Sequence, residues 1–485
     1  MTRLRHAAAV LVCAVVAACS PAPRAQAPPA VKPSLTNGLH SPAWSAADLR
    51  AVRGALSDAL GASALATSGI AIVDGDGRAL FARRERNAMT PASTFKVLAG
   101  AAALATLGPD FRFETTLEST DDPRDGTVRD LYLVGGGDPL LTRDDLRGGV
   151  GAVTRAGLRR ITGDVVGDAS AFSGAEVNRA WEPDDLQYGY AAGTSALSLD
   201  QGTVEFHLVP SSTGAPARIR VQPPSDAVTV RGAVLTSYLT LLTIERAPAT
   251  NEFTFSGRIA VGAEQSFWRP VAGLPRYAAR VARAMLRERG VEVEGGTRVG
   301  VAPLAPYVLW RHRSAPLRDI VRDMLHESNN HVAEQLLRAI GAERGAGTEA
   351  GGAAVERGLL SAYGVPAPGL RIVDGSGLAP SNRIAALTLA TFLARAEATP
   401  SGRVFREALP RVGIEGTVRY RQVADARGRA RAKSGHIAGV NALAGYVRTR
   451  RHGDVAFAII VNDRRANDGP VERGIDRALD ALARS

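Results

Sequence analysis

The sequence predicts an α/β fold of the α+β type that is interrupted by a large, mostly β insertion of one or two domains. Helical and strand-like patterns occupy both ends of the chain, whereas short alternating runs divided by Pro, Gly and Ser dominate its middle. Ser93 and Ser328, which the chemistry described below needs in one cleft, lie 235 positions apart. With 485 residues, of which 45% are hydrophobic, the chain can bury the cores of two or three domains.

The N-terminus has the pattern of an export signal. A basic start is followed by an apolar run over residues 7–18, which is too short to span a bilayer as a helix. The run ends at Val16-Ala17-Ala18-Cys19, which resembles the bacterial lipobox. We therefore expect a signal peptide over residues 1–18 and lipidation of Cys19. The alternatives are ordinary signal cleavage near residues 25–27 and a Cys19 that is merely one more small residue.

Residues 19–36 are rich in Pro and Ala and are typical of an extended linker from a membrane anchor. Because Cys13 lies within the signal, the mature chain keeps no thiol for an internal disulfide, which excludes cysteine redox chemistry and cysteine metal sites. No other stretch is long and apolar enough to cross a membrane. We expect a soluble body that is exported to the cell envelope, in the periplasm or on the outer face of the membrane, and touches the membrane only through its lipid anchor.

The net charge of +11 favours acidic partners. In an exported protein these are wall polymers or lipid head groups rather than nucleic acid, because the arginines are scattered among acids and only 5% of the residues are aromatic. We expect no nucleic-acid partner, and a solvated basic surface is the simplest explanation of the charge.

The first part of the predicted catalytic domain covers residues 37–109. Helical spacing of apolar residues predicts a helix over residues 46–60, and two short apolar runs around a glycine turn predict a β-hairpin over residues 70–81. Pro91 then opens a helix that ends at Gly108. Residues 97–104 of this helix are apolar on all sides, which predicts burial in the middle of a domain.

Residues 110–301 form the predicted insertion, with strands at 204–209, 218–221 and 253–255. The second part of the catalytic domain covers residues 302–485. It begins with two helices, whose connection carries residues 328–330, and ends with three strands and a final helix from about Val471. The first of these strands, over residues 430–437, carries residues 433–435.

Three short motifs propose a serine acyl-transfer site: Ser93-Thr94-Phe95-Lys96, Ser328-Asn329-Asn330 and Lys433-Ser434-Gly435. In the first, a hydroxyl and an amine lie on one face of a helix, so Ser93 is a candidate nucleophile and Lys96 a candidate base. Burial at the head of an apolar helix disfavours the charged lysine, which could then act as a neutral base near pH 7. The other motifs add a second hydroxyl, a carboxamide, a cation and a glycine that lets substrate approach the backbone.

Each motif also has a purely structural interpretation. Ser93 could cap a helix beside a surface lysine, Ser328 and Asn330 could cap the next helix, and Lys433 could be an exposed strand residue. The order of the motifs and the apolar character of the first helix favour catalysis. Gly435, beside a lysine and a small hydroxyl on a β-edge, suits an extended substrate that ends in a carboxylate.

The ordered motifs resemble those of the serine penicillin-recognising fold, which hosts β-lactamases and penicillin-binding proteins. Residues 133–140, 374–378 and 416–418 further resemble the low-molecular-mass class C penicillin-binding proteins, the D-alanyl-D-alanine carboxypeptidase/endopeptidase family, which also carries a long insertion between its first two motifs. The resemblance covers the chain from about residue 40 to its end. It implies a transpeptidase domain with a central antiparallel sheet flanked by helices.

The resemblance implies a serine DD-peptidase of peptidoglycan maturation that cuts the terminal D-Ala-D-Ala bond of stem peptides, and cross-links between them. Ser93 would be acylated by the penultimate D-alanine, Lys96 would take the hydroxyl proton, and Ser328 would relay a proton to the leaving amine. Asn330 would hold the substrate amide and help to fix Lys96. β-Lactams would be covalent inhibitors, and neither a cofactor nor a metal is expected.

The third motif would bind the end of the substrate. The resemblance implies that Lys433 and Ser434 bind the terminal carboxylate and that the backbone N–H groups of Ser93 and His436 hold the oxyanion, each worth about 3 to 4 kcal/mol. Ser434 stands where threonine is commoner in the family, and His436 where a small hydroxyl residue is usual, so its ring could alter the fit of stem peptides.

Two other functions suit the same motifs. A β-lactamase or esterase of this fold would differ mainly in fast deacylation. No acidic residue about three positions after Asn330 stands out as a base for that step, although Glu334 lies near enough in sequence to be considered. A non-enzymatic cell-wall-binding lipoprotein would keep the fold without turnover. The intact motifs argue against the lipoprotein, and the long insertion favours the peptidase.

Overall fold

The computed structural model of the protein describes residues 39, 44–60, 68–463 and 468–485. The predicted signal peptide, the lipidation at Cys19 and the linker lie outside the described residues. Within the described part of the chain, no helix combines the length and the apolar character that a bilayer span requires.

A five-stranded antiparallel sheet is built from both ends of the chain, in the order β2-β1-β22-β21-β20. The predicted hairpin and the three predicted C-terminal strands are its members. β20 lies at an edge: the segment around Arg411 pairs with its residues 430–432, and the strand order gives the rest of its outer side no strand partner among the described residues, so an extended ligand could pair there. The strands are β1 (Ser68–Val73), β2 (Ala79–Arg83), β20 (Ala430–Ile437), β21 (Val440–Arg448) and β22 (Asp454–Asn462).

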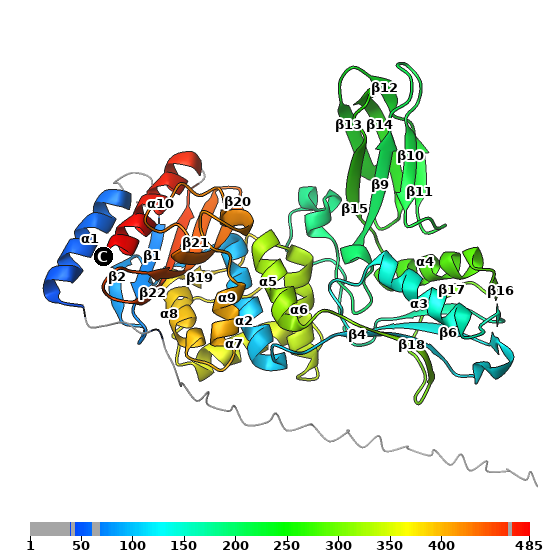
Figure 1. Cartoon of the computed structure of the whole chain (residues 1–485), viewed down its shortest axis with the longest axis horizontal. Helices are drawn as coiled ribbons and strands as arrows, with labels where there is room; N and C mark the ends of the chain where they lie inside the picture. The colour runs from blue at the N-terminus through cyan, green and yellow to red at the C-terminus, as the bar shows by residue number, and fades with distance from the viewer. Residues whose placement is uncertain (1–38, 40–43, 61–67, 464–467) are drawn as a thin grey trace, which may run out of the picture. The chain divides into compact units, whose positions relative to one another are not determined.

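Helices cover both faces of this sheet (Figure 1). Ile70 and Ile72 of β1 pack on the side of α1 (Ala46–Leu60) and α10 (Asp468–Arg484), while Ala71 and Val73 pack on the side of α8 (Ala386–Glu397). Successive side chains of a strand point to opposite faces, so a strand that is buried on both faces must be apolar throughout. This accounts for the continuous apolar runs of β1, β21 and β22 and confirms the predicted sheet flanked by helices.

The helical layer beside α8 carries the first two motifs. Its centre is α2, whose first nine residues, from Lys96 to Leu104, are all buried, which confirms the predicted burial. A 3₁₀ turn precedes α2, and a two-stranded ribbon lies nearby. The elements are η1 (Ala92–Phe95), α2 (Lys96–Leu107), α5 (Leu317–Glu327), α6 (Asn330–Ala342), α7 (Glu349–Ala362), α9 (Gly402–Ala408), β3 (Ala88–Met89) and β19 (Ile384–Ala385).

The insertion is mostly β, as predicted, and has its own buried core. It also contains α3 and α4, which the sequence did not predict. One mixed sheet has the order β17-β8-β6-β4-β18, and smaller sheets have the orders β16-β7-β5, β10-β9-β15 and β11-β14-β12, with β13 paired to β14. The elements are β4 (Glu114–Ser119), β5 (Thr127–Val128), β6 (Leu131–Gly135), α3 (Arg143–Arg155), β7 (Arg160–Ile161), β8 (Val165–Asp168), β9 (Thr203–Val209), β10 (Arg218–Gln222), β11 (Thr229–Gly232), β12 (Leu235–Ser237), β13 (Leu241–Arg246), β14 (Glu252–Ala260), β15 (Gln265–Pro270), α4 (Leu274–Glu288), β16 (Glu292–Val293), β17 (Thr297–Val299) and β18 (Tyr307–Arg313).

One predicted boundary shifts. β18 lies after residue 302, in the segment that the sequence assigned to the catalytic domain, yet it pairs with β4 of the insertion. The predicted boundary at residue 302 rests on a change in sequence pattern. The sheet itself is completed only by β18, which pairs with β4, the strand of this sheet that comes first in the chain. The sheet of the insertion therefore extends to residue 313.

Candidate active site

The first motif lies on two kinds of helix rather than on one. Ser93 is on the 3₁₀ turn η1, and Lys96 is the first residue of α2, so the prediction of a single helix from Pro91 is wrong in this detail. A 3₁₀ helix has about three residues per turn, which places residues three apart directly above one another. The tight turn therefore brings Lys96 Nζ to 2.9 Å from Ser93 Oγ.

The turn around Ser93 is held by close backbone packing. Ala92 has φ 47, in the left-handed region that non-glycine residues rarely adopt. Gly377 and Gly435 lie against the turn on two sides. A Cβ at Gly377 would meet Ala92 O at 2.0 Å, and one at Gly435 would meet Ser93 N at 3.0 Å. Only glycine permits these approaches, so the loop that carries Gly377 and the strand that carries Gly435 fix the nucleophile's backbone.

Lys96 is fully buried, and three oxygens accept hydrogen bonds from its amine. Besides Ser93 Oγ, they are Asn330 Oδ1 at 2.6 Å and the carbonyl oxygen of Ser376 at 2.8 Å. Burial lowers the pKa of Lys96 to about 7, against the opposing effects of Asp374 and Glu334. A large share of Lys96 is therefore uncharged near neutral pH, and it can accept a proton.

The second motif lies where α5 passes into α6. Ser328 ends α5 in the left-handed conformation, with φ 59. Asn329 caps α6 by accepting the Val332 N–H at 3.1 Å, so capping falls to Asn329 rather than to Ser328 or Asn330. Asn330 is then free to bridge: its Oδ1 accepts from Lys96, and its Nδ2 donates to the Tyr190 carbonyl at 2.9 Å.

The third motif lies on the edge strand β20. Lys433 is fully buried, which contradicts the interpretation as an exposed strand lysine, and its Nζ donates to the Ser434 carbonyl at 2.7 Å. Burial, with a smaller contribution from Lys96, holds the pKa of Lys433 well below its usual value. Ser434 Oγ lies 2.8 Å from Thr417 Oγ1, and both hydroxyls are accessible. The edge strand thus carries a buried amine that interacts with Lys96, and beside it lie two accessible hydroxyls.

His436 extends the edge beyond the motif. Its side chain is exposed, and its ring Nδ1 lies 3.3 Å from Asn441 Oδ1 on the neighbouring strand β21. The ring therefore has a partner within the sheet.

Sequence reasoning missed three groups at this site: the Ser376 carbonyl, the Tyr190 carbonyl and the Thr417 hydroxyl. Ser376 and Thr417 lie in stretches whose sequence carried the family resemblance, which was the available signal. Tyr190 carried none, since a backbone carbonyl leaves no trace in the residue type. Glu334 is almost completely buried, and its carboxylate accepts the N–H groups of Gly375 and Ser376, so it supports that loop.

Gly435→Ala should slow acylation by labelled penicillin about 10- to 100-fold, the usual penalty for displacing reacting groups by about 1 Å. The new Cβ would lie 2.8 Å from Pro91 O and 2.9 Å from Thr94 N, so strand and turn must separate. The rate of adduct formation measures the effect. Gly148→Ala is the matched control, because a Cβ there meets nothing within 4 Å. Equal rates for the two variants would contradict the close packing.

Known proteins resemble this chain over most of its length. A family model, described as the D-Ala-D-Ala carboxypeptidase 3 (S13) family, matches residues 52–485. A D-alanyl-D-alanine carboxypeptidase of Actinomadura sp. (strain R39) is 34% identical over 439 residues, which cover 85% of this chain and 80% of the relative. The carboxypeptidase DacB of Mycolicibacterium smegmatis is 31% identical, with 98% of this chain and 95% of the relative covered.

A solved structure shares the fold. The crystal structure of penicillin binding protein 4 (dacB) from Haemophilus influenzae superimposes with a TM-score of 0.77 at 24% identity, covering 89% of this chain and 99% of that chain. The likeness confirms the predicted penicillin-recognising fold. The predicted class of enzyme, a serine-type D-Ala-D-Ala carboxypeptidase, is confirmed by the family match. The family also accords with export to the cell envelope, while the signal peptide and the lipid anchor stay predictions. The chain belongs to the D-Ala-D-Ala carboxypeptidase 3 (S13) family.

Proposed function

We propose that the chain removes the terminal D-alanine from peptidoglycan stem peptides through an acyl-enzyme on Ser93. The observation that carries this proposal is the 2.9 Å contact between Lys96 Nζ and Ser93 Oγ, in a site where burial brings the pKa of Lys96 to about 7. The uncharged amine accepts the hydroxyl proton as the serine oxygen attacks the carbonyl of the penultimate D-alanine.

The tetrahedral intermediate places a negative charge on the former carbonyl oxygen. The backbone N–H groups of Ser93 and His436 stabilise this oxyanion in the proposed mechanism. Its collapse breaks the C–N bond, and Ser328 passes a proton to the departing amine, so that D-alanine leaves. Water then hydrolyses the ester on Ser93 and regenerates the enzyme.

The substrate's terminal carboxylate binds Lys433 and Ser434 in this proposal. Lys433 is buried in the edge strand, and the charge of Lys96 lowers its pKa further. A carboxylate at this point restores the charged amine, because an opposite charge in a buried site favours ionisation. The paired hydroxyls of Ser434 and Thr417 supply further donors. Binding therefore selects chains that end in a free carboxylate.

β-Lactams react at the same serine. The carbonyl of the strained ring takes the place of the D-alanine carbonyl, but its nitrogen stays tethered and cannot leave the site. Two relatives support this proposal: the Haemophilus influenzae protein was also solved with a β-lactam, and a Dictyostelium discoideum relative is named penicillin-sensitive carboxypeptidase A.

The test is to incubate the protein with labelled penicillin and, separately, with stem pentapeptides, and to follow both by mass spectrometry. We expect a lasting penicillin adduct that peptide mapping places on Ser93, and the loss of one D-alanine from the pentapeptide. Rapid penicillin hydrolysis without a lasting adduct would favour a β-lactamase. No reaction with either compound would favour the wall-binding lipoprotein, and an adduct elsewhere would remove Ser93 from the mechanism.

We also propose cleavage of cross-links between stem peptides. Extended peptides can pair with the outer side of β20 beyond residue 432, whether the group that leaves is D-alanine or a second stem peptide. Purified cross-linked dimers should be converted to monomers by the same preparation. Persistence of the dimers while pentapeptides are trimmed would restrict the enzyme to carboxypeptidase activity.

We propose further that Cys19 is lipidated after removal of residues 1–18, and that residues 19–36 tether the enzyme. The support is the apolar run that ends in Val-Ala-Ala-Cys. Membrane fractionation of the wild type and Cys19→Ser tests the anchor: the variant should move to the soluble fraction. We place the catalytic domain in residues 37–109 and 314–485, on either side of the insertion.

A further inference from the structure

The loop over residues 373–382 supplies one of the three hydrogen-bond acceptors of Lys96. The acceptor is the carbonyl oxygen of Ser376, at 2.8 Å from Lys96 Nζ. The amide group that contains this carbonyl also contains the N–H of Gly377, which donates to Asp374 Oδ1 at 2.8 Å. The Ser376–Gly377 peptide group therefore accepts a hydrogen bond from Lys96 through its oxygen and donates one to the Asp374 carboxylate through its N–H.

Asp374 is fully buried, and four N–H groups satisfy its carboxylate. Besides Gly377 N–H, Asn382 Nδ2 donates to Oδ1 at 2.7 Å, while Ala379 N–H and Trp181 Nε1 donate to Oδ2 at 2.6 and 3.0 Å. A carboxylate that accepts an amide N–H polarises that amide, and chains of hydrogen bonds strengthen one another in a low dielectric. The Ser376 oxygen is thus both fixed in place and made a better acceptor.

We propose that Asp374 is a positioning residue for Lys96, which it holds through the Ser376–Gly377 peptide group and to which it presents a negative charge. The inference rests on the proposed role of Lys96 as the base. It assigns the Asp-Gly-Ser-Gly stretch a function: the aspartate directs the lysine, the serine supplies the carbonyl, and the second glycine, with φ 80, permits the turn.

Three other ionisable groups surround this pair. Glu334 of α6 accepts the N–H groups of Gly375 and Ser376, and its pKa is raised to about 8 by burial and by Asp374. Glu356 of α7 is buried with neither carboxylate oxygen hydrogen-bonded in the described structure, and burial raises its pKa well above the usual value. Lys433 of β20 interacts electrostatically with Lys96, and its pKa is lowered by burial and, to a smaller extent, by Lys96. Burial therefore favours the uncharged form of both glutamates.

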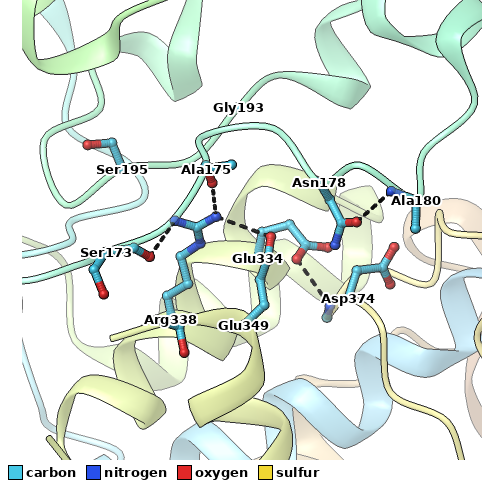
Figure 2. A network of polar contacts seen from close by, with 12 residues as sticks. Ser173, Ala175, Asn178, Ala180, Gly193, Ser195, Glu334, Arg338, Glu349 and Asp374 are labelled. Atoms are coloured by element: carbon cyan, nitrogen blue, oxygen red, sulfur yellow. Dashed lines mark hydrogen bonds and ion pairs between the residues drawn. The ribbon is translucent and has the colours of Figure 1, made fainter. Parts of the chain in front are cut away.

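The insertion contributes to this arrangement. Two residues of its segment 178–181 bind the loop over residues 373–382. Trp181 donates to Asp374, and Asn178 Nδ2 donates to the Val373 carbonyl at 3.0 Å. Figure 2 shows the overlapping stretch from Ser173 to Ala180 lying along α6. There Arg338 of α6 donates to the backbone carbonyls of Ser173 and Ala175. The position of Lys96 thus depends on residues that lie some 85 positions beyond it in the inserted sequence.

The test is the pH dependence of acylation by labelled penicillin in Asp374→Asn, which keeps the size of the side chain and removes its charge. We expect the maximal rate to fall about 10- to 100-fold, because the lysine is less well placed. The acid limb should also move to lower pH, because Lys96 loses an anion that favours its protonated form. A merely structural role would lower the amount of folded enzyme and leave the midpoint unchanged.

Two controls separate these outcomes. Trp181→Phe keeps the charge and removes one donor, so we expect a several-fold loss of rate with a smaller shift of the midpoint. Asp476→Asn removes another buried carboxylate, which binds Arg421 and lies outside the site, and should lower the melting temperature without moving the midpoint. If Asp374→Asn does not fold, an unchanged acylation rate in folded Trp181→Phe overturns the proposal.

Failure of this inference differs from failure of the proposed function. If Lys96→Arg acylates as fast as the wild type, Lys96 is not the base and the proposed mechanism falls with the inference. If Lys96→Arg loses acylation while Asp374→Asn keeps both its rate and its midpoint, the mechanism stands and Asp374 has no positioning role.

Discussion

Ser93→Ala should abolish covalent labelling by penicillin and reduce D-alanine release by about 10⁴-fold or more, the scale on which loss of a catalytic serine acts in other serine hydrolases. Among the residues that the structure describes, the one hydroxyl that accepts a hydrogen bond from Lys96 is that of Ser93, at 2.9 Å, so removing it leaves the base without a nucleophile to activate. Intact-protein mass measures the adduct, and chromatography of the pentapeptide measures the release.

Ser256→Ala is the matched control for this change, because Ser256 is an exposed residue of β14 in the insertion. Its adduct and its rate should equal those of the wild type. The melting temperature of Ser93→Ala should stay close to that of the wild type, since the serine makes one polar contact that stabilises little. Pentapeptide trimming that survives in Ser93→Ala would sink the assignment of the nucleophile.

Lys96→Arg should slow acylation by about 10²- to 10⁴-fold, the range that general-base catalysis supplies. Arginine keeps the positive charge but does not lose its proton in a protein, so it cannot accept one from Ser93. In the wild type, burial lowers the pKa of Lys96 to about 7. The acylation rate should therefore rise as the pH increases through about 7, because deprotonation creates the active base.

The control for this prediction is Lys32→Arg, the same chemical change at a lysine outside the motifs. Its pH profile should match that of the wild type. The residual activity of Lys96→Arg should show no rise near pH 7, since its guanidinium does not titrate there. A profile with the wild-type midpoint in Lys96→Arg would assign the titrating group to another residue.

Elements with strong local periodicity were predicted well from the sequence. The helix over residues 46–60, the hairpin that follows it and the three C-terminal strands appear as predicted, because helical spacing marks the first and short apolar runs mark the strands. α4 was missed although its buried residues repeat at helical spacing, because the strand-like pattern of the surrounding insertion dominated the interpretation. The boundary at residue 302 failed because β18 belongs by pairing to a sheet that begins at β4.

The composition of the chain contains a further signal about the site. Only three lysines occur, at positions 32, 96 and 433, in a chain with 59 basic residues. Two of the three lie in the motifs and are fully buried. A buried lysine can become neutral, whereas arginine cannot, so an arginine-rich protein must still use lysine wherever the amine has to give up its proton.

The sequence by itself determined the residues of the three motifs, their order and the class of chemistry that they perform, because residue type decides which side chains can be nucleophiles and bases. Only the tertiary structure decided what makes Lys96 a base near neutral pH. The lysine's burial, the carbonyl of Ser376 that binds it and the carboxylate of Asp374 behind that carbonyl come from separate segments. Backbone groups and long-range burial depend on how segments pack, and a residue's identity does not record them.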